Sequence, residues 1–125
     1  MLLAGCFWRT YGRLAATHVD LLVAMARKGT DLVASGRLTA ESMPELTYPL
    51  ERAQAFAAGW SGGAAPPWLR AFTDLLDRYR ELVDALDRVR RDAKGDAAAA
   101  ALREPLGRVD AAADTVRAAL GGGRS

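Results

Sequence analysis

Hydrophobic residues between Trp68 and Val89 recur at a spacing that alternates between four and three positions. One row comprises Trp68, Phe72, Leu75, Tyr79, Leu82, Leu86 and Val89, and a second row beside it comprises Leu69, Leu76 and Val83. Three apolar positions in every seven form one continuous stripe along an α-helix. The pattern therefore predicts a long amphipathic helix. Pro67 suits its first turn, and the helix should end near Ala93, before Gly95.

A second long helix is predicted from about Phe7 to Ser35. The row that we expect to face the core comprises Phe7, Tyr11, Leu14, His18, Leu21, Met25 and Leu32, with Trp8, Ala15 and Leu22 alongside. Gly29 interrupts this row at a cost of about 1 kcal/mol. Because the row continues beyond it, we favour one helix that Gly36 ends in the left-handed conformation. The alternative is a stop at Gly29 and a short helix from Thr30.

A shorter helix is predicted before a loop at residues 59–67 that is rich in glycine and proline. Ser42 and Glu45 have the spacing of a capping box. The side chains expected to face the core are Leu46, Leu50, Ala53 and Ala57, with Phe56 beside them. Proline is tolerated in the first turn of a helix but not in its middle. This helix therefore either spans 43–58 with a kink near Pro49 or begins at Pro49.

A last helix is predicted after Gly95, with Asp96 as its N-cap. Its apolar row is again spaced by four and three positions and comprises Leu102, Leu106, Val109, Ala113, Val116 and Leu120. Pro105 should kink or restart this helix. Residues 121–125 are three glycines followed by arginine and serine, and we expect them to form a flexible tail.

These elements together predict an all-α fold, an antiparallel helical bundle of three long helices plus one short or kinked helix. The connecting loops are short enough to turn the chain back on itself. We expect a single domain over residues 1–120. The chain contains no run of 18 apolar residues, so no membrane span is expected.

Composition changes this picture little. The formal net charge is +2, and all of the 17 basic residues except Lys28 and Lys94 are arginine. A chain with this bias, and with neither Ile nor Asn, is typical of a GC-rich bacterial genome, so abundant arginine alone does not indicate nucleic acid. Cys6 is the single cysteine, which excludes an intramolecular disulfide and agrees with a cytoplasmic location. Residues 3–6 match the pattern before a lipidated cysteine, but we expect this match to be accidental because only five residues precede Cys6. The alternative is a mis-assigned start codon that has removed an upstream signal.

Residues that could carry catalysis do not form a constellation. Ser61 lies in a G-x-S-x-G sequence, but that motif needs a preceding strand and a later histidine, whereas the only histidine is His18. Carboxylates of the helix that starts at Pro67 are spaced for ion pairs with arginines four residues on. These pairs are Asp74–Arg78, Asp84–Arg88 and Asp87–Arg91. We therefore expect a protein that is not an enzyme and has no cofactor.

His18 is the remaining candidate for a ligand site. It lies between Leu14 and Leu21 on the predicted core-facing row, where a structural histidine is the simplest interpretation. A metal ion would need two or three further ligands, and Met25 is about 10 Å away along the helix axis. No metal site is therefore expected. A small-molecule or haem pocket around His18, Tyr11 and Met25 is one alternative function.

A second alternative is an anion-binding or nucleic-acid-binding patch in a small ribonucleoprotein subunit. Its residues would be Arg9, Arg13, Arg88, Arg90, Arg91 and Lys94. The last four gather at the end of a helix, where cations also complement the helix dipole. Interleaved Asp84, Asp87 and Asp92 would weaken the field of such a patch.

Aromatic residues supply the leading functional hypothesis. Trp8 and Tyr11 lie in the first helix, and Trp60 and Trp68 flank the glycine-proline loop. Such residues either close one end of the bundle or form the hot spot of an interface. We predict a non-enzymatic accessory or scaffold subunit, or a homo-oligomer, that acts through protein contacts made by Trp8, Tyr11, Trp60 and Trp68.

Overall fold

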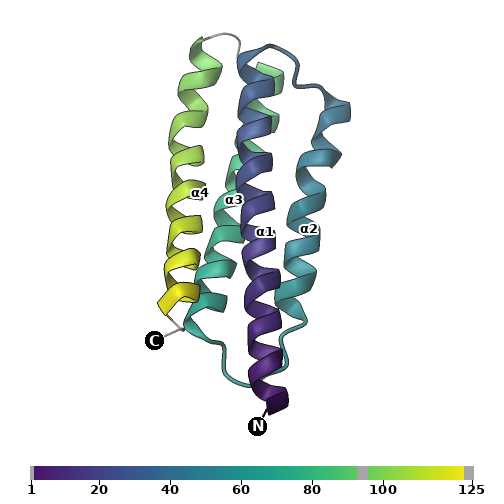
Figure 1. The fold of residues 1–125 in the computed structure, drawn as a ribbon. Coiled ribbons are helices and arrows are strands. Elements are labelled where there is room, and N and C mark those ends of the chain that lie inside the picture. Colours follow the sequence, from purple (N-terminus) through teal and green to yellow (C-terminus); the bar gives the residue numbers. More distant parts are fainter. Residues whose placement is uncertain (1, 93–95, 123–125) are drawn as a thin grey trace.

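The described residues form a bundle of four α-helices. A computed structural model describes residues 2–92 and 96–122, and the side chains of 10–92 and 96–121. The elements in chain order are α1 (Leu2–Ala34), a short 3-10 turn η1 (Ala40–Ser42), α2 (Met43–Ala58), α3 (Pro67–Asp92) and α4 (Asp96–Gly122) (Figure 1). The predicted all-α fold is confirmed, and the described residues contain no strand. No helix in the described ranges is both long enough and apolar enough to cross a bilayer.

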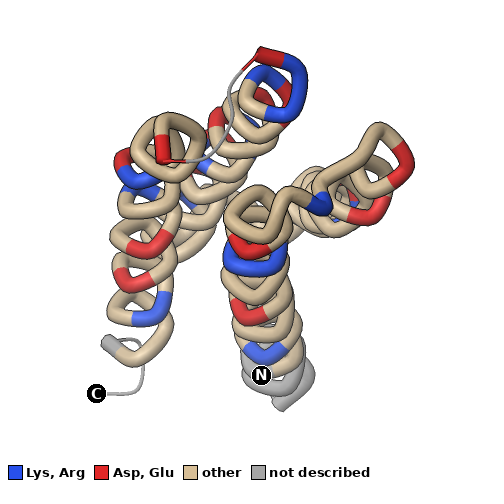
Figure 2. The backbone as a smooth tube through the Cα atoms, turned by 90° about the horizontal axis from the view of Figure 1, so that it is seen from above, with Lys and Arg blue, Asp and Glu red and all other residues tan. Residues whose placement is uncertain are grey.

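Successive helices run in opposite directions, so α1 and α3 are parallel to each other (Figure 1). These two helices also touch, and they form the centre of the bundle. α4 packs against α1 and α3 on one side, and α2 packs against the same two helices on the other side (Figure 2). No residues of α2 and α4 in the described ranges approach each other closely. The outer flank of α2 therefore has no helix covering it.

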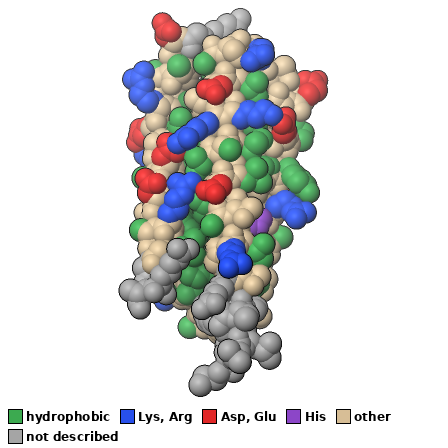
Figure 3. Space-filling view, viewed as in Figure 1, with side chains coloured by type: hydrophobic (Ala, Val, Ile, Leu, Met, Phe, Trp, Pro, Cys, Tyr) green, Lys and Arg blue, Asp and Glu red, His purple; other side chains and the backbone are tan. Residues whose placement is uncertain are grey.

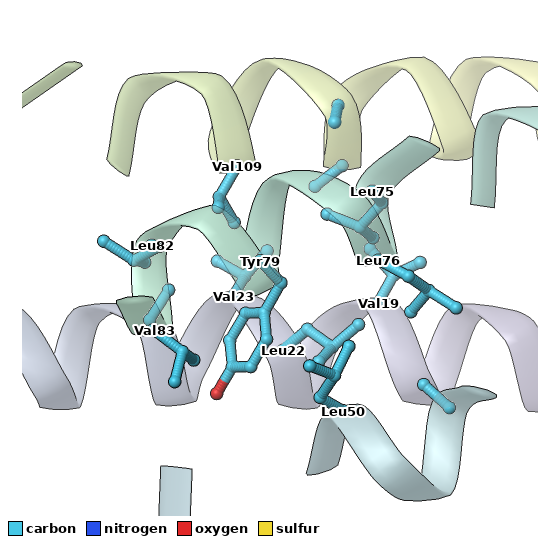
Figure 4. Close-up of a cluster of buried hydrophobic side chains, with 14 of the residues drawn as sticks. Val19, Leu22, Val23, Leu50, Leu75, Leu76, Tyr79, Leu82, Val83 and Val109 are labelled. Carbon is cyan, nitrogen blue, oxygen red and sulfur yellow. The ribbon is translucent and has the colours of Figure 1, made fainter. Parts of the chain in front are cut away.

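α3 supplies the largest share of the core, and both of its predicted rows are entirely buried. The periodicity identified the buried face correctly because α3 contacts all three other helices and needs a wide apolar face. Figure 4 shows Leu75, Tyr79 and Leu82 of α3 together with side chains of α1, α2 and α4, among them Leu22 and Val109.

The buried face of α1 agrees with the prediction only in part, because Ala15 and Leu22 of the neighbouring row are buried whereas Leu14 and Leu21 of the main row are not. Its fully buried side chains are Ala15, Val19, Leu22, Val23 and Ala26. Leu14 and Leu21, by contrast, are 46% and 44% exposed. The buried row is thus shifted by one residue position from the predicted row that contains Leu14 and Leu21, which is a rotation of about 100° around the helix axis. Alanine and valine side chains lie beside Leu22 on the buried face because three helices approach α1 closely, whereas Leu14 and Leu21 lie on its flank.

Gly29 lies inside α1, which continues through it as one helix. A Cβ atom at this position would lie 2.8 Å from Cδ1 of Leu86 in α3 and 3.2 Å from Cδ1 of Leu46 in α2. The missing side chain therefore allows three helices to meet at one point. Gly36, with a φ of +68°, follows the helix in the left-handed conformation, as predicted.

α2 and α4 are both continuous across their internal prolines, Pro49 and Pro105. The predicted capping box of α2 is wrong. The Ser42 hydroxyl accepts a hydrogen bond from the N–H of Thr39 at 3.3 Å, and Glu45 instead forms an ion pair with Lys28. The η1 turn leads directly into α2, so Ser42 is already helical and does not act as a side-chain cap.

α4 places its predicted row against α1 and α3. Leu102, Val109, Ala113 and Val116 are buried, and Leu106 and Leu120 are half-buried. At the end of α4, residues 121 and 122 belong to the helix rather than to the predicted tail. The predicted stop at Gly95 and the last three residues of the predicted tail lie outside the described residues.

Candidate functional site

Five aromatic rings from α1, α2, α3 and the α2–α3 loop form one cluster near the end of the bundle where α1 begins. The Tyr11 ring lies 5.1 Å from that of Phe56 and meets Trp60 edge-on at 5.2 Å. Trp60 meets Trp68 edge-on at 5.8 Å, and Phe56 meets Phe72 at 5.5 Å. Offset and edge-to-face contacts at such distances stabilise the fold beyond the area that they bury. This cluster closes the end of the bundle.

Two of these aromatic residues also tie down the α2–α3 loop. The Tyr11 hydroxyl donates to the carbonyl of Gly59 at 3.1 Å, and Nε1 of Trp60 donates to the carbonyl of Gly63 at 3.1 Å. Trp68 is only 8% exposed and offers almost no surface to a partner. We therefore do not retain Trp68 as a contact residue, and Tyr11 and Trp60 serve the internal cluster. The side chain of Trp8 lies outside the described residues.

His18 lies where α1 meets α2 and α3. Its ring is 4.8 Å from that of Phe56 and 6.2 Å from that of Phe72, and part of it remains exposed. Burial, and secondly the positive charge of Arg52, lower the pKa of His18 below its usual value. No group of three metal-binding side chains occurs among the described residues. Aromatic carbon surrounds the buried side of the imidazole, so this arrangement provides no second ligand there.

The arginines of the predicted anion-binding patch lie at different levels of the bundle. α1 and α3 are parallel, and Gly29 lies beside Leu86. Arg13 therefore lies roughly 24 Å along the axis from the level of Leu86, at 1.5 Å per residue. It cannot form one patch with Arg88, which is two residues beyond Leu86. The side chains of two other predicted members, Arg9 and Lys94, lie outside the described residues.

Asp87 binds two of the arginines at the end of α3. Its carboxylate lies 2.7 Å from Arg90 and 2.6 Å from Arg91. The hydrogen bond from Arg90, followed by the charges of both arginines, lowers the pKa of Asp87. The predicted Asp87–Arg91 pair is therefore confirmed, as is the Asp74–Arg78 pair at 3.5 Å.

A surface depression of about 340 Å³ adjoins these arginines. Its lining residues are Glu81, Asp84, Asp87, Arg88 and Arg91. The predicted ion pair between Asp84 and Arg88 is not formed. Neither side chain has an ionic partner among the described residues. Acidic and basic groups alternate around the depression, so it does not form the single-sign surface that nucleic acids bind.

Comparison of the chain with protein-family models, with curated proteins and with solved structures finds no match.

Three large hydrophobic side chains are exposed in the described part of the chain. Leu14 and Leu21 of α1 are about half exposed, and Tyr48 of α2 is 57% exposed. Leu14 and Leu21 precede and follow His18 by four and three residues, so they share its side of α1, which faces α2. Hydrophobic side chains gather along this junction, next to the single histidine (Figure 3). We define the α1–α2 strip as Leu14, His18, Leu21, Tyr48 and Arg52.

Two contacts fix how the two helices align at this strip. Near one end Lys28 pairs with Glu45, and further along His18 packs on Phe56. Because α1 and α2 are antiparallel, Leu21 lies near the level of Arg52. The residues of the strip therefore form one surface, although Leu21 and Tyr48 are 27 positions apart in the sequence.

Arg52 gives the strip its charge. Its guanidinium lies 5.9 Å from the centre of the Tyr48 ring and donates to the Tyr48 hydroxyl at 3.3 Å. Among the described residues Arg52 pairs with no carboxylate. An exposed guanidinium held beside the Tyr48 ring is well placed to receive a carboxylate from another molecule.

The sequence contained no signal that singled out this strip. Leu14, His18 and Leu21 belong to the most regular heptad row of α1, and such rows are typical of a core. Tyr48 and Arg52 are four residues apart on α2, a spacing that places them on one face but does not show which face is exposed.

Proposed function

We propose that this protein is a non-enzymatic helical bundle that binds another protein through the α1–α2 strip. The observation that supports this proposal is that all three large, exposed hydrophobic side chains of the described residues lie at one helix junction. Single exposed leucines are ordinary on protein surfaces, whereas exposed apolar side chains that cluster mark interaction sites. A role as an accessory or scaffold subunit would follow from such binding.

We assign one amphipathic helix of a different protein as the occupant of the strip. Amphipathic helices bind other helices through apolar side chains at intervals of three and four residues, and such a helix lying along α1 would meet Leu14 and Leu21 in this way. From Leu14 to Met25, near the level of Tyr48, the strip extends about 16 Å, or three turns of a partner helix.

A second copy of this chain is a poorer occupant. Three half-exposed side chains contribute a few hundred Å², whereas a stable interface buries about 800 Å² on each partner. The strip alone therefore favours a single helix held with modest affinity over a stable symmetric dimer.

Site-specific photo-crosslinking in the native cell tests the proposed function. The photoreactive residue replaces Leu21, and a matched variant carries it at Ala111, which is exposed on α4. We expect a covalent adduct with one distinct protein from position 21 and not from position 111. Replacing Leu14 and Tyr48 by serine should abolish that adduct while the circular dichroism spectrum stays unchanged.

Other crosslinking results would contradict the proposal. The same adducts from both positions, or no adduct from position 21, would show that the strip binds no protein partner. Adducts only with a second copy of this chain would replace the proposed partner by self-association, which light scattering of the purified protein would then detect.

A further inference from the structure

We infer that the partner helix is acidic and presents a carboxylate to Arg52 and His18, so that binding to the α1–α2 strip strengthens as the pH falls. This inference rests on the proposed function and adds the chemistry of the partner. Three features of the strip support it: a cation without a counter-ion, a half-exposed imidazole beside it and an apolar row next to both.

Two carboxylates near the strip, Glu45 and Asp20, are engaged in ion pairs elsewhere. Glu45 pairs with Lys28 at one end of the strip. Asp20 is adjacent to Leu21 in the sequence, but it is turned toward α4, where it pairs with Arg117 at 3.0 Å. The positive charge of Arg52 therefore has no partner within the described residues, and a negative group on the bound helix would complement it.

The surroundings of His18 make its protonation depend on what binds. On the α3 side the imidazole lies next to Phe72, which cannot titrate. On the α2 side it lies next to Phe56 and near the positive charge of Arg52. In the free protein these surroundings favour the neutral imidazole. A carboxylate placed beside His18 and Arg52 would offset both the desolvation and the repulsion. Binding would then be coupled to proton uptake by His18, and the affinity would increase as the pH falls.

The apolar part of the strip defines the rest of the partner. Leu14 and Leu21 are two turns apart on α1, so a helix lying alongside should carry apolar residues at intervals of three, four and seven positions. A membrane surface fits less well. Helices that lie in a membrane interface need a broad apolar face, whereas this row is narrow and the Lys28–Glu45 ion pair borders it.

Two synthetic helical peptides serve as probes for this inference. Both are about 18 residues long, or five turns, and carry leucines at the spacing given above. The flanking positions are glutamate in one peptide and lysine in the other. Fluorescence anisotropy with each labelled peptide measures Kd at low salt between pH 5.5 and 7.5. We expect the glutamate peptide to bind at least tenfold more tightly and to gain several-fold in affinity on going from pH 7.5 to 5.5.

Two variants and one matched control assign the effect to the named side chains. Arg52→Gln should remove most of the preference for the glutamate peptide, and His18→Gln should remove the pH dependence. Arg103→Gln is the control, because Arg103 is exposed on α4 and forms no described ion pair. It should leave both properties unchanged.

Equal affinity for the two peptides, or a preference that survives Arg52→Gln, would overturn the inference. So would binding of anionic phospholipid vesicles that shows the same dependence on Arg52 and His18, since the ligand would then be a lipid surface. If the glutamate peptide fails while position 21 still crosslinks to a protein, only the acidic character of the partner is wrong. If position 21 gives no adduct either, the proposed function fails with it.

Discussion

The hydroxyl of Tyr79 in α3 donates a hydrogen bond to the backbone carbonyl of Leu46 in α2 at 2.5 Å. Leu46 precedes Pro49 by three residues, in the turn where proline lacks an N–H donor and its ring disturbs the helix. A side chain of α3 thus binds a backbone group of α2 in the turn whose hydrogen bonding Pro49 interrupts. Burial raises the pKa of Tyr79, so the phenol remains a donor under all ordinary conditions.

Replacing Tyr79 by phenylalanine removes this hydrogen bond and leaves the ring in place. We expect the free energy of unfolding to fall by about 1 kcal/mol, the usual net contribution of one hydrogen bond. Urea denaturation measures the change. Tyr48→Phe is the matched control, because its hydroxyl is exposed, and it should alter stability by less than about 0.5 kcal/mol. Equal effects of the two substitutions would argue against a special role for the Tyr79 hydroxyl.

The adjacent residues Leu21 and Leu22 test which face of α1 is buried. Leu22 is fully buried and Leu21 is 44% exposed. Leu22→Ala should lower the free energy of unfolding by about 2–5 kcal/mol, because it leaves a cavity in the core. Leu21→Ala should cost less than about 1 kcal/mol, because it removes only partly buried surface. Denaturant titration of both variants gives the comparison, and a larger loss for Leu21→Ala would restore the face expected from the heptad row.

Gly29→Ala tests the close approach of α1, α2 and α3. Alanine improves helix propensity by about 1 kcal/mol, but its Cβ would overlap Cδ1 of the packed Leu86. We expect a net loss of about 1 kcal/mol, within the range of overpacking substitutions. In a Leu86→Ala background the overlap with Leu86 disappears and only the 3.2 Å approach to Leu46 remains, so the same substitution should become clearly less destabilising.

Gly107→Ala provides the matched control for Gly29→Ala in both the unmodified protein and the Leu86→Ala background. Gly107 lies inside α4, where a Cβ atom would meet nothing within 4 Å. This substitution should stabilise the protein by up to about 1 kcal/mol in either background. A Gly29→Ala effect that does not depend on Leu86 would show that the two residues are not coupled.

The pH dependence of stability should contain a contribution from His18. Its pKa in the folded protein is lowered from 6.5, so the unfolded chain binds a proton more readily than the folded one. Stability is therefore lost as the pH falls through the pKa of the unfolded state and below it. His18→Gln should flatten the dependence of the free energy of unfolding between about pH 7 and 5.

Asp87→Asn distinguishes the effect of His18 on the pH dependence of stability from the effect of a carboxylate. The pKa of Asp87 is lowered from 3.8, so its contribution is present at higher pH and is lost only as the pH falls below that value. The variant should therefore change the curve at more acidic pH than His18→Gln does. Thermal unfolding across buffers from pH 3 to 8 resolves the two windows, and an unchanged slope for His18→Gln would contradict the position assigned to this residue.

The sequence by itself determined the helices and much of the core. Spacings of four and three residues identified the buried rows of α3 and α4, because a wide apolar face can be covered only by neighbouring helices. Glycine and proline predicted where α1 ends and where α3 begins, because their backbone preferences are local.

Only the tertiary structure decided which row of α1 is buried and which surface remains available to a partner. Two adjacent apolar rows are equally compatible with a helix, and the choice depends on how closely the other helices approach. Three helices approach the Ala15 and Ala26 side of α1, so small residues are buried there and Leu14 and Leu21 remain on the flank. The same long-range packing gathered the aromatic rings into one cluster and separated Arg13 from the arginines of α3, because the direction of each helix in the bundle cannot be read from local spacing.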